Sequence, residues 1–165
     1  MKISNKQINK VGEIIRNGTD DEKEQAIESL NLWRYNHMMP LRDIRTIVDR
    51  RLKKLDIDCI VGQRLKRMTS IIGKIVRFPN MAIFKMQDVG GIRIIVPKIS
   101  DVQRVHDALK KKSKHEVVVP PKDYIDIPKP DGYRSLHQVF KYQNDQNEDI
   151  NNMRIEIQIR TRLQH

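Results

Sequence analysis

The sequence has few of the residues on which several large classes of protein depend. Cys59 is the only cysteine in 165 residues, so the chain can form neither an internal disulfide nor a zinc site built from cysteines. We interpret Cys59, which lies beside Ile60 and Val61, as a small core residue of a protein in a reducing compartment. Aromatic residues make up 5% of the chain, which argues against an extended surface for stacking single-stranded bases.

Long apolar runs are also missing. No run approaches the roughly 20 residues that a membrane span requires, and the N-terminal residues Met1 to Lys6 lack the apolar stretch of a secretory signal. The composition, with 38% hydrophobic and 32% charged residues, is typical of a soluble folded domain. The sequence therefore predicts a cytoplasmic protein with no membrane partner.

Positive charge is what the sequence has in excess. Its 32 Lys and Arg residues outnumber 21 Asp and Glu residues, which gives a net charge of +11 at neutral pH. A charge of this size favours nucleotides, phosphates, RNA or an acidic membrane surface as partners. It does not choose among them.

Helical patterns occupy the first third of the chain. Apolar residues recur at helical spacing in three stretches, which are Ile3 to Ile15, Ala26 to Trp33 and Leu41 to Leu55. Gly18 ends the first stretch, and Thr19 with Glu22 predicts a capping box for the second. Pro40 suits the first turn of the third. We therefore predict an N-terminal helical segment over residues 1–58.

Strand patterns begin after this segment. The predicted strands are Gly91 to Val96, Val117 to Val119 ended by Pro120 and Pro121, Leu136 to Tyr142, and Met153 to Ile159. Between them we predict a short helix over Ser70 to Arg77, and a second over Asp101 to Lys112 that Ser100 and Gln103 would cap. This interleaving predicts an α+β or α/β domain with a mixed β-sheet over residues 59–165.

The last predicted strand alternates apolar and polar residues without exception. Side chains two residues apart share a face of a strand. The apolar set, which should face the core, is Met153, Ile155, Ile157 and Ile159. The polar row on the other face is Arg154, Glu156, Gln158 and Arg160. Taken alone, the segment could also be an ordinary strand with a solvated polar face.

An acidic residue stands at the mouth of the first predicted strand. Asp88 precedes Gly90 and Gly91, which allow a backbone or a ligand to approach closely. Asp88 and Glu156 could then hold Mg²⁺, which prefers a few carboxylates plus substrate phosphate oxygens to a full protein cage. A turn aspartate beside two turn glycines is an equally good interpretation of this stretch alone.

Cationic and hydroxyl side chains gather between Arg64 and Arg77. Lys74 and Arg77, three residues apart, share a helical face. Thr69 and Ser70 mark the predicted start of that helix, where free backbone N–H groups attract phosphate. The stretch lacks the glycine-rich loop of P-loop enzymes, which excludes that class. A basic helix end can also be merely solvated.

A proline-rich turn precedes two further candidate residues. Pro128 to Gly132 has the composition of a turn, Tyr133 follows it, and His137 lies four residues further on. An aromatic residue just after an exposed turn can stack on a nucleobase. Taken alone, however, Tyr133 is more often a packed rim residue, and His137 a satisfied histidine.

Together these stretches resemble the synthetase domain of the RelA/SpoT family, including its small stand-alone members. The matching residues are Arg64, Lys66, Ser70, Lys74 and Arg77; Asp88, Gly91 and Arg93; Asp123 to Ile125 with Pro128, Lys129 and Gly132 to His137; and Glu156 to Thr161. They occur in the family's order and at about its spacing, over residues 60 to 165. The resemblance implies a nucleotidyltransferase-like mixed sheet flanked by helices. It also implies transfer of pyrophosphate from ATP to the ribose 3′-hydroxyl of GDP or GTP, which is alarmone synthesis and releases AMP.

The resemblance also implies a role for each matching residue. Arg64 and Arg93 would clasp the adenine of ATP, and the residues that would hold its phosphates are Lys66, Ser70, Lys74 and Arg77. Asp88 and Glu156 would bind Mg²⁺, and Glu156 would also help to take the proton from the attacking hydroxyl. The residues implied on the acceptor side are Lys129, Tyr133 and His137, with Gln158 and Arg160 completing the polar row.

The acceptor stays open at the level of sequence. The stretches Arg64 to Met68 and Met86 to Gly91 look closer to the toxic branches of small alarmone synthetases, some of which modify the 3′ end of transfer RNA. The basic cluster Lys110 to Lys114 suits an RNA acceptor, and it equally suits a loop over a phosphorylated product. A catalytically inactive RNA-binding module is a further alternative. Against it, a pure anion site gains nothing from Asp88 and Glu156.

The ends of the chain carry two further expectations. Family members continue beyond Arg162 to His165 into a helix, so the resemblance implies a chain truncated at its C-terminus, of uncertain activity. The N-terminal helices show no His-Asp metal motif of a hydrolase. The resemblance also allows for a homo-oligomer and for an antitoxin partner.

Overall fold

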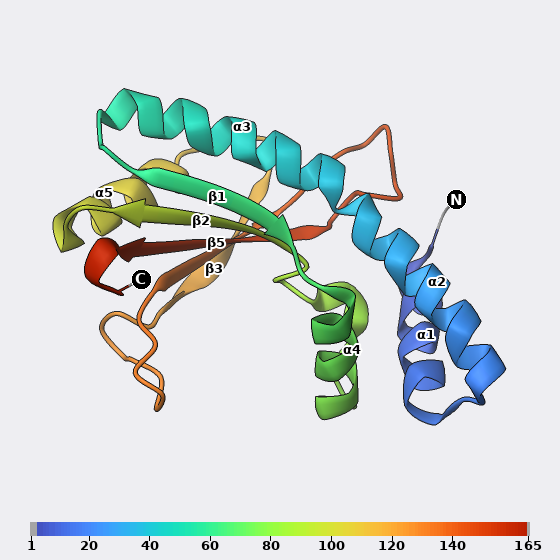
Figure 1. The fold of residues 1–165 in the computed structure, drawn as a ribbon. Coiled ribbons are helices and arrows are strands. Elements are labelled where there is room, and N and C mark those ends of the chain that lie inside the picture. The colour runs from blue at the N-terminus through green and yellow to red at the C-terminus, as the bar shows by residue number, and fades with distance from the viewer. Residues whose placement is uncertain (1–2, 165) are drawn as a thin grey trace.

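A five-stranded β-sheet with helices packed on one face forms the centre of the molecule (Figure 1). The structure, a computed structural model, describes residues 3–164. The described range leaves out Met1 and Lys2, at the start of the predicted segment 1–58, and His165, at the end of the predicted segment 59–165. Within that range, no helix combines the length and the apolar character needed to cross a membrane.

Three helices precede the first strand. They are α1 (Asn5–Asn17), α2 (Asp20–Asn36) and α3 (Met38–Leu55). The predicted capping box at Thr19 and Glu22 is confirmed, and Ser4 forms a second one with Gln7 at the start of α1. One apolar core joins these helices to the sheet, because Leu30 of α2 and Ile44 of α3 belong to the same buried cluster as Ile157 of the last strand.

The remaining elements are a mixture of helices and strands, as the sequence predicts. They are β1 (Ile60–Leu65), α4 (Met68–Arg77), β2 (Gly90–Val96), α5 (Ile99–Leu109), β3 (Glu116–Asp123), β4 (Leu136–Lys141) and β5 (Arg154–Thr161), with short 3-10 helices at Ile83–Lys85 and Arg162–Gln164. The strand order is β1-β2-β5-β4-β3. The central β2 and β5 are parallel, and every other neighbouring pair is antiparallel. The predicted mixed sheet is therefore confirmed.

The two faces of the sheet differ in what covers them. Ile155, Ile157 and Ile159 of β5 are fully buried, and both α3 and α5 pack on β2 and β5. The other face carries the polar residues of β5, and no helix among residues 3–164 covers it in this way. Figure 1 shows α3 above the sheet, whereas α4 and the orange loop after β3 flank the space below it. We call this second face the open face.

Two strands depart from the prediction. The strand β1 was not predicted, because it is an edge strand whose Gly62, Gln63 and Arg64 are exposed and it lacks clear apolar alternation. The strand β3 was predicted to end at Pro120, but it continues to Asp123. Proline lacks the N–H of a strand ladder, yet an edge strand tolerates it. The pairing of β3 with β4 accordingly shifts register between Val118 and Lys122.

Both helices predicted after residue 60 are present, but each begins two residues earlier than predicted. The helix α5 begins at Ile99 after Lys98, and no side chain caps it, so the capping box expected from Ser100 and Gln103 does not form. The helix α4 begins at Met68 after Arg67, also without a side-chain cap. The capping-box pattern therefore predicted the cap correctly at Thr19 and wrongly at Ser100.

We predict that Thr19→Ala destabilises the protein by about 1 kcal/mol, because it removes the hydroxyl that accepts the N–H of Glu22. Ser100→Ala is the matched control, since the exposed Ser100 caps nothing. Urea unfolding of both variants measures the difference. Equal losses of stability in the two would contradict the caps described here.

Candidate active site

Strand pairing brings the polar side chains of the open face into two rows. In the first row Arg64 of β1 lies opposite Gly91 of β2, and Gly91 lies opposite Glu156 of β5. The second row runs through Gly62, Arg93, Gln158, His137 and Lys122, one from each strand of the sheet. Because paired residues point to the same side of a sheet, one face gathers charged groups from all five strands.

A cavity of about 500 Å³ lies over these rows. Two glycines open the space next to it. A Cβ atom on Gly91 would meet only the backbone oxygen of Glu156, at 3.9 Å, and one on Gly62 would meet nothing within 4 Å. The absence of side chains at these two positions therefore leaves room for a ligand above Glu156.

Two lysines hold Asp88 at one side of the cavity. Lys66 Nζ donates to Asp88 Oδ2 at 2.8 Å, and Lys74 Nζ donates to Asp88 Oδ1 at 2.9 Å. The three residues come from the end of β1, from α4 and from the segment before β2, and the N–H of Lys66 donates to the Val89 carbonyl at 2.7 Å. Burial alone would raise the pKa of Asp88, but the hydrogen bonds and charges of the two lysines outweigh it and hold that pKa below its usual range.

Glu156 is held from the opposite side of the cavity. His137 Nδ1 lies 3.0 Å from Glu156 Oε1, and Gln158 Nε2 donates to Glu156 Oε2 at 3.0 Å. Burial would raise the pKa of Glu156, but the hydrogen bond and charge of His137, with the bond from Gln158, lower it overall. The negative charge of Asp88, which lines the same cavity, acts in the opposite direction and raises the pKa of Glu156.

Aromatic rings and a lysine form the wall beside Glu156. The hydroxyl of Tyr133 lies 3.0 Å from His137 Nε2, and the Tyr124 ring meets His137 edge to face with centroids 5.0 Å apart. Lys129 Nζ lies 4.7 Å from the Tyr124 centroid and 4.9 Å from that of Tyr133. A chain of contacts therefore joins Tyr133 through His137 to the Glu156 carboxylate.

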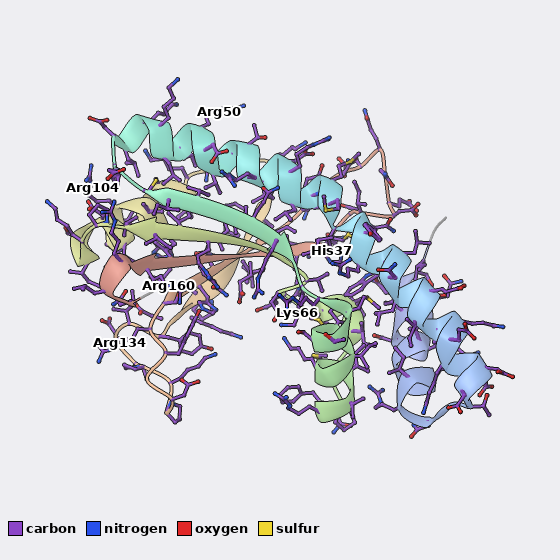
Figure 2. All side chains as sticks on the ribbon, viewed as in Figure 1. His37, Arg50, Lys66, Arg104, Arg134 and Arg160 are labelled. Carbon is purple, nitrogen blue, oxygen red and sulfur yellow. The ribbon has the colours of Figure 1, made fainter. Side chains whose placement is uncertain are left out.

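Two arginines add positive charge to the same face. Arg160 is buried, and its guanidinium lies 5.9 Å from the centroid of the Tyr133 ring (Figure 2). Burial, and then the charge of Arg93, lower the pKa of Arg160, so the two cations are neighbours. Arg93 Nε is buried with no hydrogen-bond partner within residues 3–164. The site thus holds cationic charge in excess of what its own carboxylates neutralise.

Comparison with known proteins identifies this arrangement. A family model described as the region found in RelA / SpoT proteins matches residues 63–165, which is more than half of the chain. The chain belongs to the RelA/SpoT family.

Relatives with assigned activities are longer than this chain. GTP pyrophosphokinase YwaC of Bacillus subtilis (strain 168) is 38% identical over 105 residues, which are 59% of this chain and 49% of YwaC. GTP pyrophosphokinase YjbM of the same strain is 34% identical over 139 residues, 83% of this chain and 62% of YjbM. The chain therefore spans less than two thirds of either relative.

Solved structures of family members share the fold. The crystal structure of the small alarmone synthetase 1 from Bacillus subtilis has a TM-score of 0.70 at 26% identity, covering 83% of this chain and 73% of that one. The same synthetase bound to its product pppGpp has a TM-score of 0.67 at 29% identity, covering 86% of this chain and 74% of that one. The α+β class predicted from the sequence is that of the small alarmone synthetases.

The fold brings together most of the residues that the RelA/SpoT resemblance points to. Those that line the cavity are Arg64, Lys66, Lys74, Asp88, Arg93, Lys129, Tyr133, His137, Glu156 and Gln158. Arg160 lies beside them under Tyr133. Arg77 is exposed and lines an adjoining hollow with Lys74, Phe78 and Met81.

Ser70 does not reach the cavity. It is exposed on α4, and its backbone N–H donates to the Arg67 carbonyl at 3.0 Å. The expectation that Thr69 and Ser70 begin this helix and offer a free N–H to phosphate was therefore wrong at Ser70. The physical reason is that α4 starts at Met68, so the carbonyl of the preceding Arg67 already accepts the Ser70 N–H.

The sequence analysis assigned no role to Lys122 and Tyr124, which also line the cavity. Lys122 pairs with His137, and the N–H of Tyr124 donates to the Ser135 carbonyl at 2.9 Å. Both were missed because the predicted strand stopped at Pro120. The spacing of Lys122 and Tyr124, two residues apart, was the signal that could have found them.

The basic cluster Lys110 to Lys114 lies away from this site. Arg51 of α3 donates to the Leu109 carbonyl at 2.6 Å and to the Lys111 carbonyl at 3.0 Å. Lys112 and Lys114 line a hollow beside α3, on the helical side of the sheet. The interpretation of this cluster as a loop over a phosphorylated product was therefore wrong.

We predict that acid destabilises the fold partly through the site. The pKa values of Asp88 and Glu156 are lowered in the folded state, so their ionised forms stabilise the fold above the usual carboxyl range. This contribution is lost as the pH falls from about 5 towards 3. Asp88→Asn should flatten the fall in unfolding free energy over that window, measured by urea unfolding.

Asp145→Asn is the control, since Asp145 is exposed in the loop between β4 and β5 and forms no ion pair within residues 3–164. It should leave the pH dependence unchanged. An Asp88→Asn variant as acid-sensitive as the unmodified protein would show that Asp88 is not stabilised by its lysines.

Proposed function

We propose that this chain carries the catalytic site of a small alarmone synthetase. The reaction is the transfer of pyrophosphate from ATP to the ribose 3′-hydroxyl of GDP or GTP, with AMP as the second product. The observation that carries the proposal is the position of Asp88 and Glu156, which lie between a cationic side and an aromatic side of one cavity. Relatives named GTP pyrophosphokinase, and a related synthetase bound to pppGpp, support it.

The cationic side suits ATP. Lys66 and Lys74 already face a carboxylate, and their ammonium groups could turn towards phosphate oxygens without leaving the cavity. Arg64 and Arg93 lie in neighbouring rows of β1 and β2, where two guanidinium planes could clasp the adenine. Arg77 would act from the adjoining hollow, one turn of α4 beyond Lys74.

The two carboxylates fit a magnesium site. Both line the same cavity, and their lowered pKa values keep them ionised at neutral pH. Magnesium prefers a few carboxylate oxygens together with substrate phosphates. When bound there, the ion would neutralise phosphate charge and help to orient the reacting groups. Asp88 would hold it with Glu156, while Lys66 and Lys74 moved to the phosphates.

The aromatic side suits the acceptor nucleotide. Tyr133 could stack on the base, with Lys129 and His137 close enough to bind its phosphates. The acceptor 3′-oxygen would attack the β-phosphorus of ATP, and the bond from that phosphorus to the α–β bridging oxygen would break. Glu156, oriented by His137 and Gln158, would take the hydroxyl proton. Such a transfer needs charge neutralisation and alignment more than covalent help. We place the reaction in the cytoplasm, with its nucleotides.

A direct assay tests the proposal. The chain is given ATP labelled on the γ-phosphate, with Mg²⁺ and with GDP, GTP, ATP or deacylated transfer RNA as the acceptor. We expect label on GDP and GTP, and a loss of at least about 100-fold in rate with Glu156→Gln, because the general base is removed. The unmodified chain without Mg²⁺ is the second blank.

Each other outcome excludes part of the proposal. Label on transfer RNA alone would replace the nucleotide acceptor by RNA and make the chain a translation-blocking enzyme. Magnesium-dependent ATP binding with no labelled acceptor would favour a binding module. If Glu156→Gln labels the acceptor as fast as the unmodified chain does, Glu156 is not the general base.

We predict that Gly91→Leu strongly weakens ATP binding while the fold survives. A Cβ at Gly91 has room, so the backbone need not move, but the longer side chain would occupy the space above Glu156. Gly73→Leu is the matched control, because Gly73 is exposed on α4 with nothing within 4 Å of its Cβ position. Calorimetry should show at least about tenfold weaker ATP binding for Gly91→Leu alone. Equal binding by both variants would place the ATP elsewhere.

A further inference from the structure

A second concentration of positive charge lies outside the candidate active site. It lines a hollow of about 530 Å³ between α3 and the turn that joins α5 to β3. Its cationic residues are Arg50, Arg51, Lys54, Lys112 and Lys114. We call this the α3 hollow. It shares no lining residue with the cavity over Asp88 and Glu156.

The α3 hollow lies on the helical side of the sheet. Figure 2 shows Arg50 on α3, on the far side of the sheet from Lys66 and Arg160. The sheet and its buried core separate the two sites. A ligand in the α3 hollow therefore cannot touch one in the candidate active site.

The positive charge of the α3 hollow is not balanced by nearby acids. Asp43 is the acidic residue among its lining, and it already accepts a hydrogen bond from Tyr142 and lies 3.6 Å from Arg42 Nε. Arg51 donates to two backbone carbonyls, which fix the turn against α3 but leave its charge in place. Within residues 3–164 the remaining four cations form no ion pair.

A buried histidine in the lining of this hollow has an unpaired ring nitrogen. His115 is 4% exposed, lines the hollow and stacks on Tyr142, with ring centroids 4.7 Å apart. Its Nδ1 accepts the N–H of Gln143 at 3.0 Å, so in the neutral ring the proton must be on Nε2. That Nε2 is buried and has no partner among the described residues. A buried N–H without an acceptor is costly, and a ligand oxygen would satisfy it.

We propose that the α3 hollow binds a free oligophosphate anion. His115 Nε2 would donate to one phosphate oxygen, and the surrounding Arg and Lys side chains would neutralise the rest of the charge. The volume is that of a site for a small ligand. Apart from the His115 ring, which is stacked on Tyr142, the lining has no aromatic residue that could hold a base, so the site would recognise phosphate and not the nucleobase.

Inorganic tripolyphosphate is the probe, because it carries the phosphates without a base. Calorimetric titration of the unmodified chain should show two sites. Arg50→Ala with Lys54→Ala should weaken one by at least about tenfold, as expected when charge-assisted contacts to an anion are lost. Lys66→Met with Lys74→Met should remove the other. Lys10→Ala with Lys53→Ala, which removes the same charge from exposed positions, should change neither.

The donor on His115 is tested separately. In His115→Asn the amide oxygen can still accept the N–H of Gln143, but the donor at the position of Nε2 is gone. We expect tripolyphosphate to bind the α3 hollow about five- to tenfold more weakly, with the melting temperature nearly unchanged. If this variant melts early, Lys112→Ala with Lys114→Ala, in the exposed part of the turn, provides the second test.

Two outcomes would overturn the proposal. In the first, the Arg50→Ala, Lys54→Ala variant binds tripolyphosphate as tightly as its charge-matched control does. The other is a short single-stranded RNA that binds in a manner sensitive to Arg50 and Lys54 when tripolyphosphate does not, which would make the surface an RNA site. Because tripolyphosphate binding to the α3 hollow is measured without ATP or an acceptor, it can be interpreted even if the proposed transfer reaction fails.

Discussion

The strict alternation along β5 is the constraint on which the rest of the structure depends. Ile155, Ile157 and Ile159 lie fully buried beneath the helices, so Glu156 and Gln158 must face the other way. A slip of one residue would place a carboxylate in the apolar core and expose three isoleucines, which is costly on both counts. The burial that holds the sheet together therefore also sets the position of the acidic group in the site.

Each carboxylate of the site is held by two side chains. Asp88 is held by Lys66 and Lys74, and Glu156 is held by His137 and Gln158. These contacts keep flexible lysines ordered and keep both carboxylates ionised. Under the proposed function, phosphate oxygens would replace Asp88 as partners of the two lysines, so these cationic groups are already in place before the ligand binds, as electrostatic catalysis of phosphoryl transfer requires.

Sequence patterns succeeded where a single local property decides the structure. The alternation of β5, the capping box at Thr19 and the buried run of β2 were each visible in the residues themselves. Sequence patterns failed where contacts with neighbouring elements determine the local structure. The strand β1 is exposed and follows no apolar pattern, β3 passes through two prolines because it is an edge strand, and Ser100 has the residues of a cap without forming one.

The sequence by itself determined the kinds of residue in the site and, through period-two alternation, which of them share a strand face. It also determined the excess of positive charge. Only the tertiary structure decided which cations meet the carboxylates, because the order and register of five strands set which segments become neighbours. That is why Lys122 joined the site, Ser70 did not, and the lysines after α5 came to lie beside α3 on the opposite side of the sheet.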